Sequence, residues 1–154
     1  MIHKIRKAAV LMPILAALAA PLSASETALK VHDAWIAEAP PGVRVNAGYL
    51  IIGNQSGRKR VLTDVTSPAF SRIEMHSTVI SDDGTSSMQR QKRIPVPAGE
   101  RFRFSPGGHH LMLFDGREPI RTGDEIPLIL HFADGITIDT IAAVRRINSS
   151  HEHH

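Results

Sequence analysis

Short β-rich runs, each closed by a turn signal, fill the chain from Leu29 onward and set its fold class. A typical run is Val31–Ile36, which is followed by the turn sequence Pro40-Pro41-Gly42. The other runs are Ala47–Ile52, Val61–Thr66, Ser71–Ile80, Met88–Val96, Arg101–Phe104, His110–Phe114, Ile126–Phe132 and Ile136–Val144. Helical periodicity is almost absent. This pattern predicts a single all-β domain, an antiparallel sandwich or barrel, over residues 28–147.

Two of the Asp-Gly pairs in this pattern indicate turns between neighbouring strands. Asp134-Gly135 lies between Ile126–Phe132 and Ile136–Val144, which makes this pair of runs the clearest predicted hairpin. Asp82 and Asp83, which precede Gly84, are interpreted as a solvated turn rather than as paired catalytic carboxylates.

Since no Ser-His-Asp order or Gly-rich phosphate loop stands out, we do not expect an enzyme.

The first 24 residues have the three parts of a secretory signal peptide. Lys4, Arg6 and Lys7 precede an apolar stretch over residues 8–20, and small residues follow at 23–25. We therefore expect a mature periplasmic chain that begins at Ser25 or Glu26. The apolar stretch is shorter than the roughly 20 residues that span a membrane, so the mature protein is expected to be soluble, without a membrane span.

Composition removes several classes of function. The three basic residues of the signal account for the formal charge of +3, so the remainder is formally neutral. Aromatic residues make up 5% of the chain, too few for the stacking platforms of nucleic-acid binding. The chain has no Cys, which excludes blue-copper electron transfer, zinc ribbons and thiol–disulfide exchange.

Sulfur and imidazole are concentrated in one stretch of the chain. Every Met outside the signal lies there, together with three His. The stretch contains Met75, His76, Met88, His109, His110 and Met112. Thioether sulfur is a soft ligand that favours Cu(I) over harder ions. In an exported protein without Cys, this combination predicts a soft-metal site.

Strand alternation assigns most of these side chains to faces. His110 and Met112 share one face of a strand, while Leu111 and Leu113 point to the core. Met75 must face away from His76 and is predicted to pack in the core. His32 and His131 lie in runs without soft partners and are expected to be structural, and Trp35 is expected in the core.

The face of Met88 depends on the loop that joins it to His76. A tight hairpin centred on Asp83-Gly84 would pair Met88 with Val79, on the face opposite His76. A five-residue loop over 81–85 would instead pair Met88 with Thr78, on the same face as His76. The sequence allows both.

The spacing of these residues resembles the ligand motif of the periplasmic copper chaperone family PCu(A)C. Eleven residues separate His76 from Met88, and twenty-one separate Met88 from His110-Leu111-Met112. Other segments similar to the family are Asp33–Ile36, Ala39–Gly42, Ser67–Ala69, Pro97–Gly99, Pro106–Leu113 and Phe132–Gly135. The resemblance covers nearly all of residues 30–145. One departure is His109, where another residue type is commoner; its side chain is expected to face away from Met112.

The resemblance implies a cupredoxin-like Greek-key antiparallel β-sandwich that is a monomer and binds one Cu(I). The implied ligands are His76, Met88, His110 and Met112. It also implies delivery of copper towards the Cu(A) centre of cytochrome c oxidase subunit II, or to another copper chaperone such as a Sco-type protein. Two alternatives remain open, namely a copper-sequestering or storage protein and a sandwich-type interaction module with incidental metal binding.

The polar tail over residues 148–154 carries further histidines. His151, His153 and His154 offer imidazole without sulfur, which favours Cu(II) over Cu(I). We expect an accessory Cu(II) site there, with an inert end or an expression remnant as the alternatives.

Overall fold

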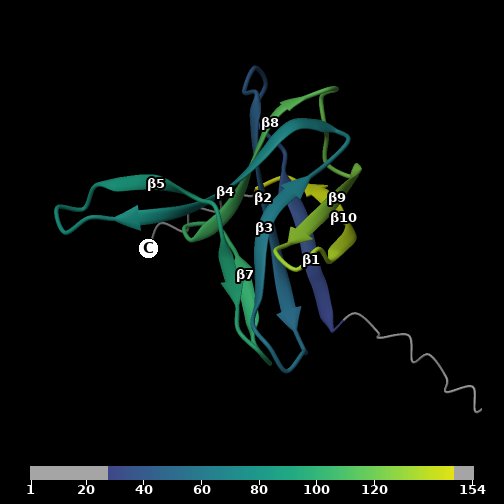
Figure 1. The fold of residues 1–154 in the computed structure, drawn as a ribbon. Coiled ribbons are helices and arrows are strands. Elements are labelled where there is room, and N and C mark those ends of the chain that lie inside the picture. Colours follow the sequence, from purple (N-terminus) through teal and green to yellow (C-terminus); the bar gives the residue numbers. More distant parts are fainter. Residues whose placement is uncertain (1–27, 148–154) are drawn as a thin grey trace, which may run out of the picture.

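The computed structural model describes residues 28–147, which form ten strands and no helix (Figure 1). The all-β prediction is confirmed. The strands are β1 (Leu29–Ala37), β2 (Val45–Asn54), β3 (Arg60–Thr66), β4 (Phe70–Ile80), β5 (Ser86–Gln91), β6 (Ile94–Val96), β7 (Arg101–Phe104), β8 (His109–Gly116), β9 (Glu125–Phe132) and β10 (Thr137–Arg145). Within the described range there is consequently no helix able to cross a membrane.

The strands form one continuous hydrogen-bonded path in the order β5-β4-β8-β2-β1-β10-β9-β3-β6, with β7 paired to β2. Neighbours in this path are often far apart in the sequence. The path folds over, so that β3 and β9 lie in front of β1 and β2 in Figure 1, while β10 lies beside β1. The β9–β10 pair is the antiparallel hairpin that Asp134-Gly135 predicted, with Gly135 at a φ of 83°.

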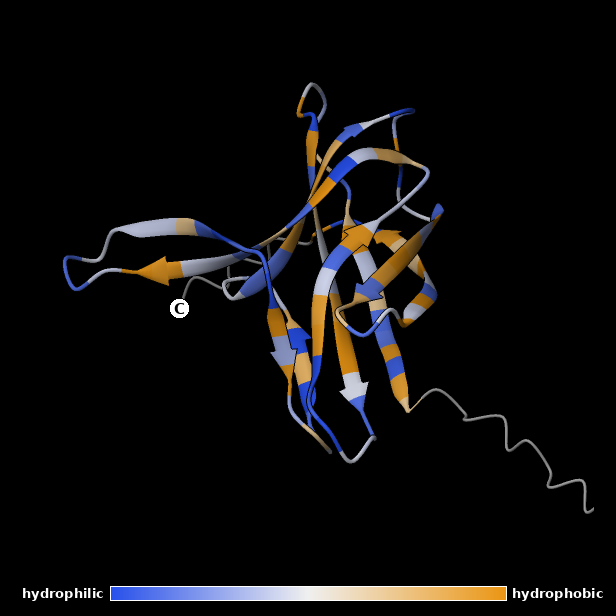
Figure 2. Cartoon of the chain, viewed as in Figure 1, coloured by the Kyte–Doolittle hydropathy of each residue, from blue (hydrophilic) through white to orange (hydrophobic). Residues whose placement is uncertain are grey.

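The core lies between the two halves of the folded path. Leu111 of β8, Leu62 of β3 and Leu130 of β9 are fully buried and belong to one cluster. Burial of such side chains stabilises the fold by roughly 1.5–3 kcal/mol each. In Figure 2 the hydrophobic colour alternates with hydrophilic colour along the body strands, as period-two patterning requires.

Three details differ from the sequence prediction. The pair formed by β1 and β10 is parallel, in a sheet that is otherwise antiparallel among the described strands. The predicted run Met88–Val96 forms two strands, because the chain bends at the exposed Lys92 and Arg93. Before the bend β5 pairs with β4, and after it β6 pairs with β3. Trp35 is half-buried on the outer face rather than in the core.

A bulge in β1 explains the position of Trp35. Asp33 has a φ of 44°, and the register with β2 shifts between His32 and Trp35. The extra residue inverts the alternation, so Ile36 enters the core and Trp35 faces outward. There its ring stacks on Tyr49, with 4.5 Å between ring centroids.

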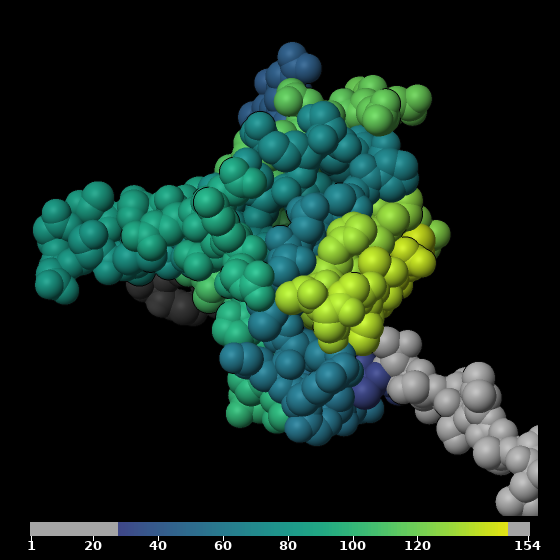
Figure 3. Space-filling model, viewed as in Figure 1, coloured from purple at the N-terminus to yellow at the C-terminus, as the bar shows by residue number. Residues whose placement is uncertain are grey.

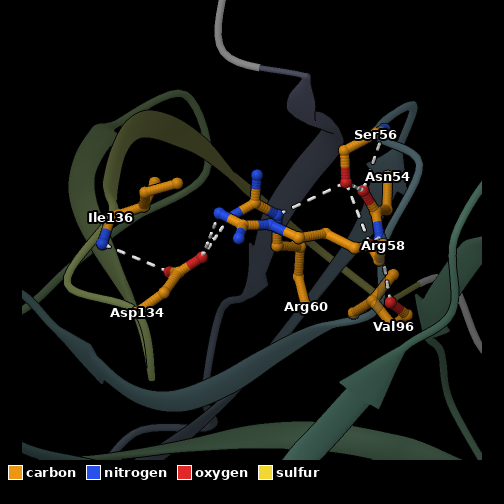
Figure 4. Close-up of polar contacts among 7 residues, drawn as sticks. All are labelled: Asn54, Ser56, Arg58, Arg60, Val96, Asp134 and Ile136. Atoms are coloured by element: carbon orange, nitrogen blue, oxygen red, sulfur yellow. Dashed lines mark hydrogen bonds and ion pairs between the residues drawn. The ribbon is translucent and has the colours of Figure 1, made fainter.

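A polar cluster closes one end of the sandwich (Figure 4). The Asn54 side-chain amide, which is buried, donates to the carbonyl oxygens of Arg58, Val96 and Pro97, and its Oδ1 accepts from Ser56. Nearby, Arg60 forms an ion pair with Asp134. These contacts tie β2, β3 and β6 to the β9–β10 turn.

The β4–β5 hairpin projects from the body as an arm, seen clearly in the space-filling view (Figure 3). Beyond Ser77, β4 pairs only with β5 among the described strands. The arm is largely hydrophilic in Figure 2, except at the end of β4, where Ile80 is 71% exposed. One part of this hairpin therefore packs on the body and the other reaches into solvent.

Candidate metal centre

The four predicted ligands lie on one face of three adjacent strands, β5, β4 and β8. His76 of β4 stands directly opposite His110 of β8. Met112 follows two residues after His110, and Met88 stands opposite Thr78, which is two residues after His76. Since side chains two apart share a face, all four project from the same side of the sheet.

The hairpin loop is the five-residue one, which decides the face of Met88. Ile80 pairs with Ser86, so residues 81–85 form the turn. Ser81 N–H donates to the Thr85 carbonyl at 2.9 Å, and Gly84, at a φ of 82°, donates to the Ser81 carbonyl at 2.8 Å. Asp83 Oδ1 accepts from Thr85 N–H, a contact that lowers the pKa of this exposed carboxyl. The predicted solvated turn is confirmed.

Each imidazole uses one ring nitrogen in a hydrogen bond and leaves the other without a protein partner. His76 Nε2 lies 2.9 Å from Glu74 Oε2, and His110 Nδ1 lies 3.1 Å from the Gly108 carbonyl oxygen. His76 Nδ1 and His110 Nε2 are buried and unpartnered, and the ring centroids are 6.0 Å apart. Both acceptors require the bonded nitrogen to carry a proton, so in a neutral imidazole ring the other nitrogen presents a lone pair.

Unpartnered polar atoms of this kind are rare in protein interiors because each costs free energy. Two of them, one on each of two facing histidines, fit a metal ion that would coordinate both. Their hydrogen-bonded nitrogens have the acceptor partners that metal-binding histidines usually have. The residues present therefore suit a metal held by His76 Nδ1 and His110 Nε2.

Glu74 connects the site to two arginines. Its Oε1 lies 3.2 Å from Arg72 Nε and 3.3 Å from Arg90 Nη1. The hydrogen bond with His76, followed by the charges of Arg90 and Arg72, lowers the pKa of the Glu74 carboxyl despite its partial burial. The carboxylate is therefore ionised at neutral pH.

The four side chains differ strongly in exposure. His110 is 6% exposed and Met88 is 62% exposed, while His76 and Met112 are intermediate. The site is thus closed on the side of β8 and open on the side of the arm.

The neighbouring residues behave as the alternation predicted. His109 points away from Met112 and packs against Phe102, with 4.9 Å between ring centroids, and desolvation lowers its pKa. Met75 is 4% exposed in the core, as expected. His131 Nε2 lies 2.8 Å from Thr66 Oγ1, which agrees with a structural role.

A family model described as "Putative lipoprotein LpqE-like" matches residues 29–144. The chain belongs to this LpqE-like family. A curated relative is the putative lipoprotein Lxx21020 of Leifsonia xyli subsp. xyli, 26% identical over 126 residues, which are 82% of this chain and 75% of that protein. Another is the uncharacterized protein RP573 of Rickettsia prowazekii, 29% identical over 58% of this chain and about half of that protein, 49%.

Solved structures of PCuAC domains share the fold of this chain. The apo PCuAC domain from PmoF1 superposes with a TM-score of 0.67 at 19% identity, covering 77% of this chain and 94% of that one. The copper-bound PCuAC domain from PmoF2 has a TM-score of 0.65 at 23% identity, covering 77% and 93%. The Cu(I) form of DR1885 from Deinococcus radiodurans has a TM-score of 0.61 at 24% identity, covering 79% of each chain.

The donor set of this LpqE-like chain argues for soft-metal chemistry. Among residues 28–147 no group of three or more His, Cys, Asp or Glu is arranged to hold a metal ion. The thioethers of Met88 and Met112 lie on the same face of the sheet as the two free imidazole nitrogens. Thioether ligation favours Cu(I).

Two further points concern the predicted site residues. The tail histidines His151, His153 and His154 lie outside the described residues. Glu74 was not identified from the sequence, although it stands two residues before His76 and alternation alone puts both on one face.

Proposed function

We propose that the protein is an exported copper carrier that binds one Cu(I) through His76, Met88, His110 and Met112. The observation that carries the proposal is the pair of buried, unpartnered imidazole nitrogens on a sheet face that also bears two thioethers. The copper-bound structures with the same fold, and the lipoprotein description of the family, support copper as cargo and export to the periplasm.

The uneven exposure of the ligands favours a carrier over a store. An acceptor's ligand reaches Met88 without disturbing the body, because this side chain is exposed on the arm. Replacing Met88 first opens the site, and the buried His110 releases the ion last. A storage site would gain from burying every ligand. The acceptor we propose is the Cu(A) centre of cytochrome c oxidase, reached directly or through a Sco-type chaperone.

Anaerobic titration of the mature chain with Cu(I), followed by mixing with an apo Cu(A) domain, tests this function. We expect one Cu(I) bound at the core site and rapid, complete transfer to the acceptor. Tight binding without transfer would identify a copper-sequestering protein instead. Intact mass of the exported protein tests the signal, with a start at Ser25 or Glu26 expected.

A further inference from the structure

The two carboxylate oxygens of Glu74 contact different partners. Oε2 lies 2.9 Å from His76 Nε2, while Oε1 lies within 3.3 Å of both Arg72 Nε and Arg90 Nη1. The carboxylate is only 12% exposed, so these contacts are partly shielded from water. One oxygen thus holds the imidazole, and the other holds the carboxylate in place.

The contacts of Glu74 join β4 to β5, and one of its partners, Arg72, reaches β8. Arg90 of β5 stands opposite His76, and Met112 of β8 stands opposite Glu74. Arg72 is itself fixed, since its guanidinium carbon lies 4.2 Å above the ring of Phe114 on β8. Glu74 is therefore at the middle of a polar cluster on β4 and β5, and Arg72 packs this cluster against β8.

We propose that Glu74 is a positioning residue for Cu(I), which orients the His76 ring so that Nδ1 faces the ion. The inference rests on the proposed function. Its basis is the hydrogen bond from His76 Nε2–H, because the proton on one ring nitrogen leaves the lone pair on the other. Glu74 also balances charge, since without it two guanidinium groups would remain beside a cation.

The experiment compares Glu74→Gln and Glu74→Leu with the wild-type mature chain. Glu125→Gln is the matched control, because it removes one carboxylate from β9, a strand not paired with β4, β5 or β8. The first readout is nitrogen-edited NMR of the metal-free proteins. We expect the His76 Nε2–H signal to be slow to exchange in the wild type and in Glu74→Gln, whose amide oxygen still accepts. It should be lost in Glu74→Leu.

The second readout is Cu(I) affinity by competition with a chelator. Changes to residues that hold a metal ligand typically cost ten- to hundredfold in affinity. We expect a loss of this size in Glu74→Leu, a smaller loss in Glu74→Gln, which keeps the hydrogen bond but not the charge, and none in Glu125→Gln. If Glu74→Leu does not fold, Glu74→Gln still carries the test.

The outcomes separate the two proposals. Wild-type Cu(I) affinity in both Glu74 variants would overturn the positioning role and leave the carrier function intact. A His76 Nε2–H signal that exchanges fast in the wild type would do the same. No Cu(I) binding by the wild-type chain would overturn the proposed function itself.

Discussion

Replacing His110 by Leu should abolish tight Cu(I) binding without substantially destabilising the metal-free protein. His110 is 6% exposed, and its Nε2 has no partner. A buried unsatisfied polar atom costs about 1–3 kcal/mol, and the lost hydrogen bond to the Gly108 carbonyl is worth about 0.5–1.5 kcal/mol net. The Gly108 oxygen still accepts from Thr78 N–H at 3.1 Å. We therefore expect the stability of the variant to lie between about 0.5 kcal/mol below and about 2.5 kcal/mol above that of the wild type.

Urea and thermal unfolding with and without Cu(I) measure the stability of the variant and the loss of its stabilisation by Cu(I). A gain of 1 kcal/mol should raise the melting temperature by about 4 °C in a domain of this size. Cu(I) at a hundredfold excess over its Kd should stabilise the wild type by about 2.7 kcal/mol and leave His110→Leu unchanged. Leu111→Ala, on the core face of the same strand, should lose about 2–5 kcal/mol. A loss of 2 kcal/mol or more in metal-free His110→Leu would refute the reasoning, because His110 would then be a packed structural residue.

Three further predictions concern the ligands. Met88→Leu and Met112→Leu should each lower Cu(I) affinity while stability changes by less than about 1.5 kcal/mol, and unchanged affinity in the double variant would remove thioether ligation. Deleting residues 148–154 should reduce Cu(II) uptake and leave Cu(I) stoichiometry alone, whereas equal Cu(II) binding would make the tail inert. Acid should weaken Cu(I) binding by up to about tenfold per pH unit for each coordinating His. The limiting slope of two should fall to one in His76→Met, and an unchanged slope would exclude His76 as a ligand.

Local patterns predicted most of the strands and the faces of His110, Met112 and Met75. Alternation placed His110 and Met112 on one face and Leu111 in the core, because period two is a property of each strand alone. The Asp134-Gly135 hairpin was predicted for the same reason, since turn chemistry is local.

The details that escaped prediction depend on longer-range contacts or on backbone irregularities. The parallel pairing of β1 with β10 joins the two ends of the domain, and no local pattern encodes strand direction. The bulge at Asp33 inverted the face of Trp35. The face of Met88 depended on whether the turn has two residues or five, and both were compatible with Asp83-Gly84.

Copper X-ray absorption of the Cu(I)-loaded chain lacking residues 148–154 tests the central claim most directly, because it counts the donor atoms around the ion. Two imidazole nitrogens and two thioether sulfurs are predicted for the site formed by His76, Met88, His110 and Met112. The sulfur contribution should halve in Met88→Leu and disappear when Met112→Leu is added. A spectrum with no sulfur in the wild type, or one unaffected by these substitutions, would contradict the account.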